Sequence, residues 1–220
     1  MKIIISGYGK MGKELEKELS KDNNLFVVSP ETKTRFEDIK EEIDCIIDFS
    51  SHLVLKDIYS YLLHKKCALI IGTTGYNLEE ENIINKISKD HVVIKFSNYS
   101  KGMNLYFDLV ELISKYNLSS KEILIKETHH KEKKDIPSGT ALTIKEILNK
   151  DVSIESFRKE DEIGEHQVSI NLNNEEIFLI HKSYSRKIFV DGVKEIIKKI
   201  GYLKNGLYGR ENLNIWKEKK

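Results

Sequence analysis

The chain has 220 residues, of which 40% are hydrophobic and 32% charged, and 36 Lys and Arg face 35 Asp and Glu for a formal net charge of +1. This balance gives no electrostatic case for a nucleic-acid or membrane partner, and no apolar run approaches the ~20 residues that a membrane span needs, so we expect neither partner. With two cysteines, Cys45 and Cys67, in apolar runs and no leader-like segment, we expect buried thiols and a cytoplasmic location.

In the first half of the chain, short apolar runs alternate with helix-like runs. The spacing predicts strands over 2–6, 25–29, 44–50, 67–75 and 92–97 and helices over 13–21, 51–66 and 81–89. The strands lack polar alternation, which is typical of parallel strands covered on both faces. We therefore predict a Rossmann-type, doubly wound parallel sheet in an α/β protein.

After residue 98 the pattern changes to alternating polar and apolar residues. We predict strands over 121–130, 166–173 and 175–183, a hairpin at the Asn-Asn turn between the last two, and helices over 103–116, 141–148 and 192–203. These elements indicate a second α+β domain. The expected organisation is a dinucleotide-binding domain over 1–98 plus 190–220, and a substrate-binding and oligomerisation domain over 99–189.

A glycine-rich turn follows the first strand directly and opens the first helix. It reads Gly7, Tyr8, Gly9, Lys10, Met11 and Gly12, a G-x-G-x-x-G pattern. In this context the pattern predicts close backbone approach to a pyrophosphate at a helix N-terminus, although a glycine turn can also serve packing alone.

The choice between NADH and NADPH stays open at this level. Glu31 lies nineteen residues after Gly12, where an acidic residue can bind a ribose 2′-hydroxyl. Lys33 and Arg35 could instead accept a 2′-phosphate. All three could also be solvated loop residues. The loop of Gly72, Thr73 and Thr74 ends a strand at the edge where open α/β sheets bind ligands.

Residues 127–141, ETHHKEKKDIPSGTA, concentrate polar chemistry between a strand and a helix. Strand alternation puts His129 on the face of Glu127 and His130 on the opposite face, so one could act as acid or base while the other contacts a different part of the ligand. Imidazole titrates near neutral pH and suits proton transfer, while the alternative is a structural or exposed pair. Lys133 is the strongest cationic candidate among lysines that otherwise read as solvated. Zinc is not expected, because no third or fourth ligand has suitable spacing.

A helix start follows at Ser138. Ser138 can cap the helix, and the free N–H groups there, with Gly139 and the Thr140 hydroxyl, could bind a carboxylate. A cap without a ligand is the plainer alternative.

These residues resemble the 4-hydroxy-tetrahydrodipicolinate reductase (dihydrodipicolinate reductase) family of lysine and diaminopimelate biosynthesis. The family signature E-x-H-H-x-x-K-x-D-x-P-S-G-T-A is matched at every fixed position by residues 127–141. The resemblance covers nearly the whole chain, through the glycine turn, residues 47–50, 72–75 and 98–100 with Gly102, and then Arg158, Gly164, His166 and His181.

The resemblance implies a role for each motif. His129 would be the proton donor and acceptor and Lys133 a proton donor, while His130, Gly139 and Thr140 would hold the substrate's carboxylates. The nicotinamide would lie against the 72–74 loop and the segment Phe96, Ser97, Asn98 and Tyr99.

It also implies the reaction and the assembly. The family reduces a cyclic dicarboxylate to tetrahydrodipicolinate, with loss of water, using NADH or NADPH and no metal, and forms homotetramers through the second domain's sheet. The chain departs from the family at Lys10, where Arg is frequent, at Phe96-Ser97, where Ala-Pro is common, and at Lys101.

Two alternatives remain at the level of sequence. An aspartate-type dehydrogenase would need the glycine turn but has no reason for the complete 127–141 signature. A catalytically silent nucleotide sensor would keep the turn and be expected to lose His129 or Lys133, and both are present.

Overall fold

The computed structural model describes residues 1–116, 122–213 and 215–216. Its contacts divide the chain into two compact units, residues 1–96 with 190–220 and residues 97–189, called here the first and the second unit. In the described part of the chain, no helix combines the length and the apolar character that crossing a membrane requires.

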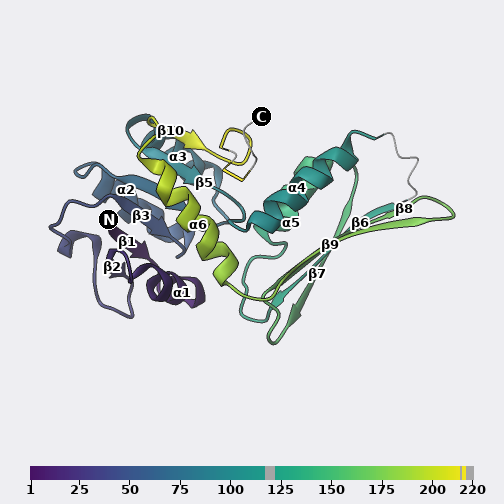
Figure 1. The fold of residues 1–220 in the computed structure, drawn as a ribbon, viewed down its shortest axis with the longest axis horizontal. Coiled ribbons are helices and arrows are strands. Elements are labelled where there is room, and N and C mark those ends of the chain that lie inside the picture. The colour runs from purple at the N-terminus through teal and green to yellow at the C-terminus, as the bar shows by residue number, and fades with distance from the viewer. Residues whose placement is uncertain (117–121, 214, 217–220) are drawn as a thin grey trace. The chain divides into compact units, whose positions relative to one another are not determined.

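The first unit is a six-stranded, fully parallel sheet with the strand order β10-β5-β4-β3-β1-β2. Its elements are β1 (Lys2–Ser6), α1 (Lys10–Leu19), β2 (Asn24–Val28), η1 (Phe36–Asp38), β3 (Cys45–Asp48), η2 (His52–Val54), α2 (Leu55–Leu62), β4 (Ala68–Ile71), α3 (Leu78–Asp90), β5 (Val92–Lys95) and β10 (Gly206–Tyr208). Helix α6 (Lys187–Ile200) enters it from the second unit. Helices lie on both sides of the sheet (Figure 1), which confirms the predicted doubly wound arrangement.

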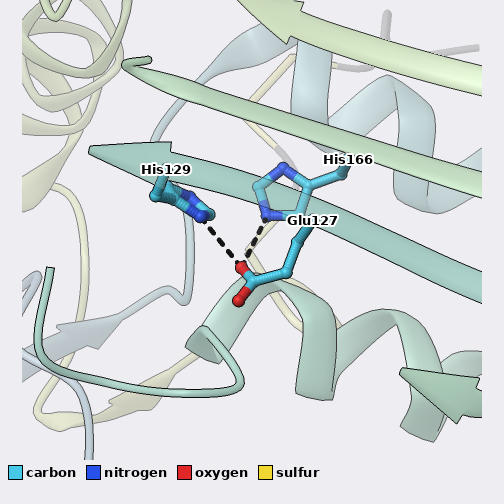
Figure 2. Close-up of side chains that lie close together, drawn as sticks. All are labelled: Glu127, His129 and His166. Atoms are coloured by element: carbon cyan, nitrogen blue, oxygen red, sulfur yellow. Dashed lines mark ion pairs between the residues drawn. The ribbon is translucent and has the colours of Figure 1, made fainter. Parts of the chain in front are cut away.

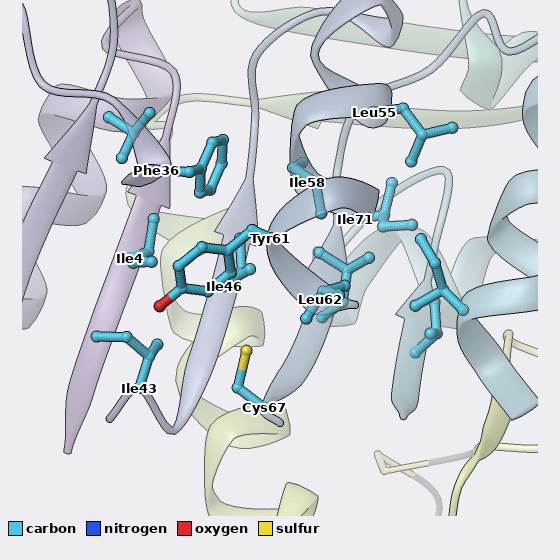
Figure 3. Packing of buried hydrophobic residues seen from close by; sticks show 14 of the residues in the cluster. Ile4, Phe36, Ile43, Ile46, Leu55, Ile58, Tyr61, Leu62, Cys67 and Ile71 are labelled. Carbon is cyan, nitrogen blue, oxygen red and sulfur yellow. The ribbon is translucent and has the colours of Figure 1, made fainter. Parts of the chain in front are cut away.

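The apolar runs form this sheet because both of its faces are buried. On one face, strand residues such as Ile4 and Ile46 pack against Ile58 of α2 and Phe36 of η1 (Figure 3). Ile4, Ile46 and Ile58 are fully buried. Each such side chain contributes about 1.5–3 kcal/mol on removal from water. Helices α1 and α6 cover the opposite face (Figure 1). An ion pair of 3.3 Å between Glu18 and Lys194 links these two helices.

The strand order reverses between β1 and β3, which places a crevice at the carboxyl ends of these strands. The glycine turn follows β1, residues 49–50 follow β3 and the Gly72 loop follows β4. Three motifs that are far apart in the sequence therefore meet at one edge of the sheet.

The second unit is a mixed four-stranded sheet in the order β7-β6-β8-β9, with two helices packed on one face (Figure 1). Its elements are α4 (Lys101–Ser114), β6 (Glu122–His130), α5 (Gly139–Leu148), β7 (Ser153–Lys159), β8 (Gly164–Asn171) and β9 (Glu176–Ser183). β6 pairs with β7 in parallel and with β8 antiparallel, and β8 and β9 form the expected hairpin. The strand predicted from Lys121 is described from Glu122, since Lys121 lies outside the described residues.

The face of this sheet away from the helices carries exposed apolar side chains. Phe157, Phe178 and Ile180 are 46%, 53% and 56% exposed. Their strand partners are Thr128, Ser169 and Gln167; the last two are half-buried and alternate with buried residues of β8, whereas Thr128 is buried.

Candidate active site

The three glycines of the first turn differ in whether the fold itself requires a glycine there. Gly7 adopts φ +93°, and a Cβ on Gly12 would lie 2.1 Å from the carbonyl oxygen of Gly7, so the fold itself requires both. Gly9 is the N-cap of α1, and a Cβ there would meet no atom within 4 Å. Packing therefore does not require Gly9, and the open space over the helix N-terminus fits the close approach of a pyrophosphate.

The other residues of the turn lie on the first turn of α1 or beside it. The hydroxyl of Tyr8 donates to Glu16, and this hydrogen bond raises the pKa of Tyr8. Lys10 is exposed and Met11 half-buried. Glu31 forms a 3.0 Å ion pair with Lys13 of α1.

A cavity of about 1110 Å³ opens beside the glycine turn. It is lined by Gly7, by Ser29, Lys33 and Arg35 after β2, and by Ser50 after β3. Lys33 has a left-handed backbone with φ +56°. The cavity is large enough for part of a dinucleotide, and its basic rim suits an anionic ligand.

A buried carboxylate holds the strand ends of this crevice together. Asp48 is 1% exposed, and one of its oxygens accepts a hydrogen bond of 2.6 Å from the Thr73 hydroxyl. The other accepts from the hydroxyl of Ser50, whose backbone N–H donates to Thr73 at 3.0 Å. Burial raises the pKa of Asp48, and these hydrogen bonds act in the opposite direction without cancelling the shift. Gly72 beside it leaves no room for a side chain, since a Cβ would lie 2.2 Å from the ring of Phe49.

Only some side chains of the segment after β5 are accessible to solvent. The side chains of Phe96 and Tyr99 are 4% and 2% exposed, so they pack internally, whereas Ser97 and Asn98 are half-buried. Within the second unit, the Asn98 amide donates to the Thr140 hydroxyl at 3.3 Å, and that hydroxyl donates to the Ser97 carbonyl at 3.4 Å. Two residues predicted for the cofactor thus contact one predicted for the substrate.

The end of β6 carries the histidines as alternation predicts. His129 is buried on the face of Glu127, and His130 is half-buried on the opposite face. Nδ1 of His129 lies 2.9 Å from Oε2 of Glu127, and Nε2 of His166 lies 4.0 Å from the same oxygen (Figure 2). Burial lowers the pKa of His166 to about 3, and the neighbouring His129 adds to this effect, so His166 is neutral near pH 7.

Glu127 is fully buried and ionised. Burial acts to raise its pKa, but hydrogen bonds involving His129, Ser138 and Ser156 hold the pKa well below its ordinary value. Its Oε1 accepts from the Arg158 guanidinium at 3.2 and 3.3 Å and from the Ser138 backbone N–H at 3.2 Å. The sequence pattern predicts no role for either Glu127 or Arg158.

The loop after β6 positions Lys133. Its ammonium forms a 2.8 Å ion pair with Asp135, and this pair lowers the pKa of Asp135 although burial acts against it. Ser138 caps α5 by accepting from the Ala141 N–H at 3.2 Å, and Gly139 and Thr140 form the first turn of that helix. This arrangement offers a cation and a helix N-terminus for negative groups.

Glu127, His129 and His166 bring potential ligand atoms within 4.8 Å of one another, as a metal centre would. However, Arg158 already supplies positive charge to the carboxylate, and the Ser138 hydroxyl lies 3.3 Å from Nε2 of His166. The positive charge that balances this carboxylate therefore comes from Arg158, while Oε2 of Glu127 and Nδ1 of His129 have no hydrogen-bond partner of good geometry among the described residues.

Comparison with known proteins identifies the family of the chain. Residues 1–99 match the family model for the N-terminus of dihydrodipicolinate reductase, and residues 102–213 match the model for its C-terminus. The 4-hydroxy-tetrahydrodipicolinate reductase of Pelagibacter ubique is 34% identical over 252 residues, covering 96% of each chain. That of Wigglesworthia glossinidia brevipalpis is 32% identical over 203 residues, covering 89% of this chain and 77% of the relative.

Solved structures share the fold at lower identity. A dipicolinate-bound dihydrodipicolinate reductase from Paenisporosarcina sp. TG-14 aligns with a TM-score of 0.70 at 20% identity, covering 97% of this chain and 99% of that one. An aspartate dehydrogenase from Thermotoga maritima aligns with a TM-score of 0.55 at 12% identity, covering 90% and 96%. With both halves matched by their family models, the chain belongs to the dihydrodipicolinate reductase family.

Proposed function

We propose that this chain reduces 4-hydroxy-tetrahydrodipicolinate to tetrahydrodipicolinate with NADH or NADPH. The observation that carries the proposal is the folding of the signature into one connected site. Buried His129, the loop with Lys133 and the N-terminus of α5 all attach to the carboxylate of Glu127 or to its partner Arg158.

His129 and Lys133 are proposed as the groups that move protons. Reduction of a conjugated imine builds negative charge on the substrate, which a cationic lysine and a proton-donating imidazole neutralise. In the structure Asp135 holds the Lys133 ammonium at 2.8 Å, which orients the lysine. Loss of the 4-hydroxyl group as water requires a proton on the leaving oxygen, which either group can supply.

The substrate's two carboxylates need separate partners. We assign one to the first turn of α5, where Gly139 and Thr140 offer backbone N–H groups and a hydroxyl. His130, on the other face of β6, is proposed for further contact with the substrate. The dipicolinate bound by the Paenisporosarcina relative is itself a dicarboxylate, which supports this substrate class.

Most of the proposed cofactor residues belong to the first unit, whereas Ser97, Asn98 and Tyr99 belong to the second. Residues of the glycine turn and of the 72–74 loop would hold the cofactor's pyrophosphate and nicotinamide sides, Glu31 or Lys33 the ribose, and residues 96–99 the remaining edge. When bound, the reduced nicotinamide supplies a hydride. The residues of this chain bind it, orient it and exclude water, and the open space over Gly9 gives its phosphates access to the helix N-terminus.

The competing functions have less support. The likeness to aspartate dehydrogenase is one of fold, which hosts many chemistries. A silent sensor would have no use for the buried network around His129.

The assembly and location are proposals of the same kind. The exposed Phe157, Phe178 and Ile180 form an apolar face that a second copy of this sheet would cover, so we propose a homotetramer built through the second unit. The near-neutral composition and two buried, unpaired cysteines favour a cytoplasmic enzyme.

Substitution of the proposed proton-transfer groups tests the function. His129→Ala and Lys133→Ala should each remove most of the turnover of 4-hydroxy-tetrahydrodipicolinate while NADH affinity, measured by fluorescence titration, stays near wild type. Lys131→Ala is the matched control, because Lys131 is exposed and pairs only at the surface with Glu160 at 2.7 Å. Full activity in either site variant would refute these roles.

A further inference from the structure

Glu127 is the charged residue around which the site is built, and the proposed proton transfers do not use it directly. It lies on β6 two residues before His129, on the same face, and is fully buried. An ionised carboxylate at such a position needs partners for both oxygens, because an unpaired buried charge is costly.

One oxygen faces the imidazole of His129. Nδ1 and Oε2 are 2.9 Å apart (Figure 2), an ion-pair contact whose angle falls short of a hydrogen bond, and the adjacent negative charge favours the tautomer with the proton on Nδ1. This leaves Nε2 as the atom that can exchange a proton with a ligand. A Cβ on residue 164 would lie 3.2 Å from Nε2, and Gly164 therefore keeps that nitrogen from being crowded.

The other oxygen organises the loop that carries Lys133. It accepts from both terminal nitrogens of Arg158 and from the Ser138 backbone N–H at the start of α5. Arg158 also donates to the Lys133 carbonyl at 3.3 Å and to the Asp135 carbonyl at 2.6 Å. One buried ion pair thus fixes the imidazole, the lysine loop and the helix N-terminus.

We propose that Glu127, together with Arg158, is a positioning residue for the reaction. It determines which nitrogen of His129 carries the proton and how the imidazole is oriented, and it holds the loop with Lys133 in place relative to His129. This inference rests on the proposed function, because the aligned groups matter only if they serve the same turnover. A purely stabilising ion pair would be replaceable by neutral side chains, whereas a positioning pair would not.

Charge removal in single and paired form separates these readings. Glu127→Gln keeps the volume but replaces one oxygen by an amide that cannot accept, so either His129 or Arg158 loses its partner. Arg158→Gln leaves the buried carboxylate unpaired and should be the least stable variant. The double variant, Glu127→Gln with Arg158→Gln, should regain thermal stability. Glu155→Gln on β7, whose side chain is 47% exposed and pairs with Lys126 at 3.5 Å, is the matched control.

For the double variant and for Glu127→Gln, we expect kcat to fall about tenfold to a hundredfold, the cost of misplacing reacting groups by about 1 Å. The KM for NADH should stay within about twofold, because the change is to positioning rather than to uniform binding. If kcat returns to the wild-type value when stability returns in the double variant, the pair is only structural and the inference is wrong.

Imidazole ¹⁵N NMR gives a readout that does not depend on turnover. In the wild type the His129 proton is expected on Nδ1, and in Glu127→Gln it should shift toward Nε2. An unchanged proton position would overturn the inference whatever the activity. Wild-type enzyme assayed in parallel keeps the two proposals apart: no wild-type turnover would count against the function, while active wild type with an equally active Glu127→Gln would count against positioning alone.

Discussion

Replacement of His166 by glutamine should remove a defined part of the acid sensitivity of the fold. His166 is 2% exposed, its pKa is lowered to about 3 by burial, and its unfolded value is that of an ordinary histidine, about 6.5. Because the folded pKa is the lower one, the neutral form stabilises the fold above pH 6.5, and that stability is lost as the pH falls toward 3.

The size of the effect follows from these two values. Near pH 5, about 1.5 units below the unfolded pKa and well above the folded one, the loss is about 2 kcal/mol relative to pH 7.5, at about 1.4 kcal/mol per unit. His166→Gln has no proton to gain, so its free energy of unfolding should fall by about 2 kcal/mol less than that of the wild type over the same interval.

Urea unfolding of both proteins at matched pH and one fixed protein concentration measures this difference, since assembly makes stability concentration-dependent. His181, whose pKa burial also lowers, is present in both proteins and cancels. Equal loss of stability in the two proteins between pH 7.5 and 5 would refute the reasoning about His166.

Three further predictions concern the first unit. Gly12→Ala should lower the melting temperature, because its methyl group would lie 2.1 Å from the carbonyl oxygen of Gly7. Gly9→Ala should leave the melting temperature unchanged and weaken NADH binding in fluorescence titration. Equal melting temperatures and equal NADH affinities in the two variants would contradict this prediction. Asp48→Asn should weaken NADH binding by about fivefold, the equivalent of one lost hydrogen bond to the Thr73 loop. If fluorescence titration gives the variant the same NADH affinity as the wild type, Asp48 does not support the cofactor site through this hydrogen bond. Lys33→Ala should raise the KM for NADPH more than the KM for NADH, because Lys33 lines the basic rim of the cavity. Equal changes in the two KM values would show that Lys33 does not discriminate between the cofactors.

The parallel sheet was predictable because its strands are short, uninterrupted apolar runs. Ile3, Ile4 and Ile5 are all fully buried, and only a strand covered on both faces accommodates three such neighbours. Strand β7 was not predicted. Its helix-side positions are Ile154, Ser156 and Arg158, so it lacks the apolar alternation that identifies a half-buried strand.

Part of the site was also readable from the sequence. Alternation alone separated His129 from His130, because β6 is regular to its end. The link between Glu127 and Arg158 was not, because it depends on parallel pairing with a strand whose own pattern gave no signal. Glu31 is similar: spacing locates it near the ribose, but spacing does not reveal the ion pair with Lys13. Its contact with the cofactor stays a prediction.

The most direct test of the account is turnover by the purified chain. Supplied with freshly generated 4-hydroxy-tetrahydrodipicolinate, it should oxidise NADH or NADPH in a one-to-one ratio with the tetrahydrodipicolinate formed, and addition of dipicolinate should slow the reaction by competing for the carboxylate site. Absence of cofactor oxidation in the presence of this substrate, by an enzyme that binds NADH or NADPH, would contradict the central claim.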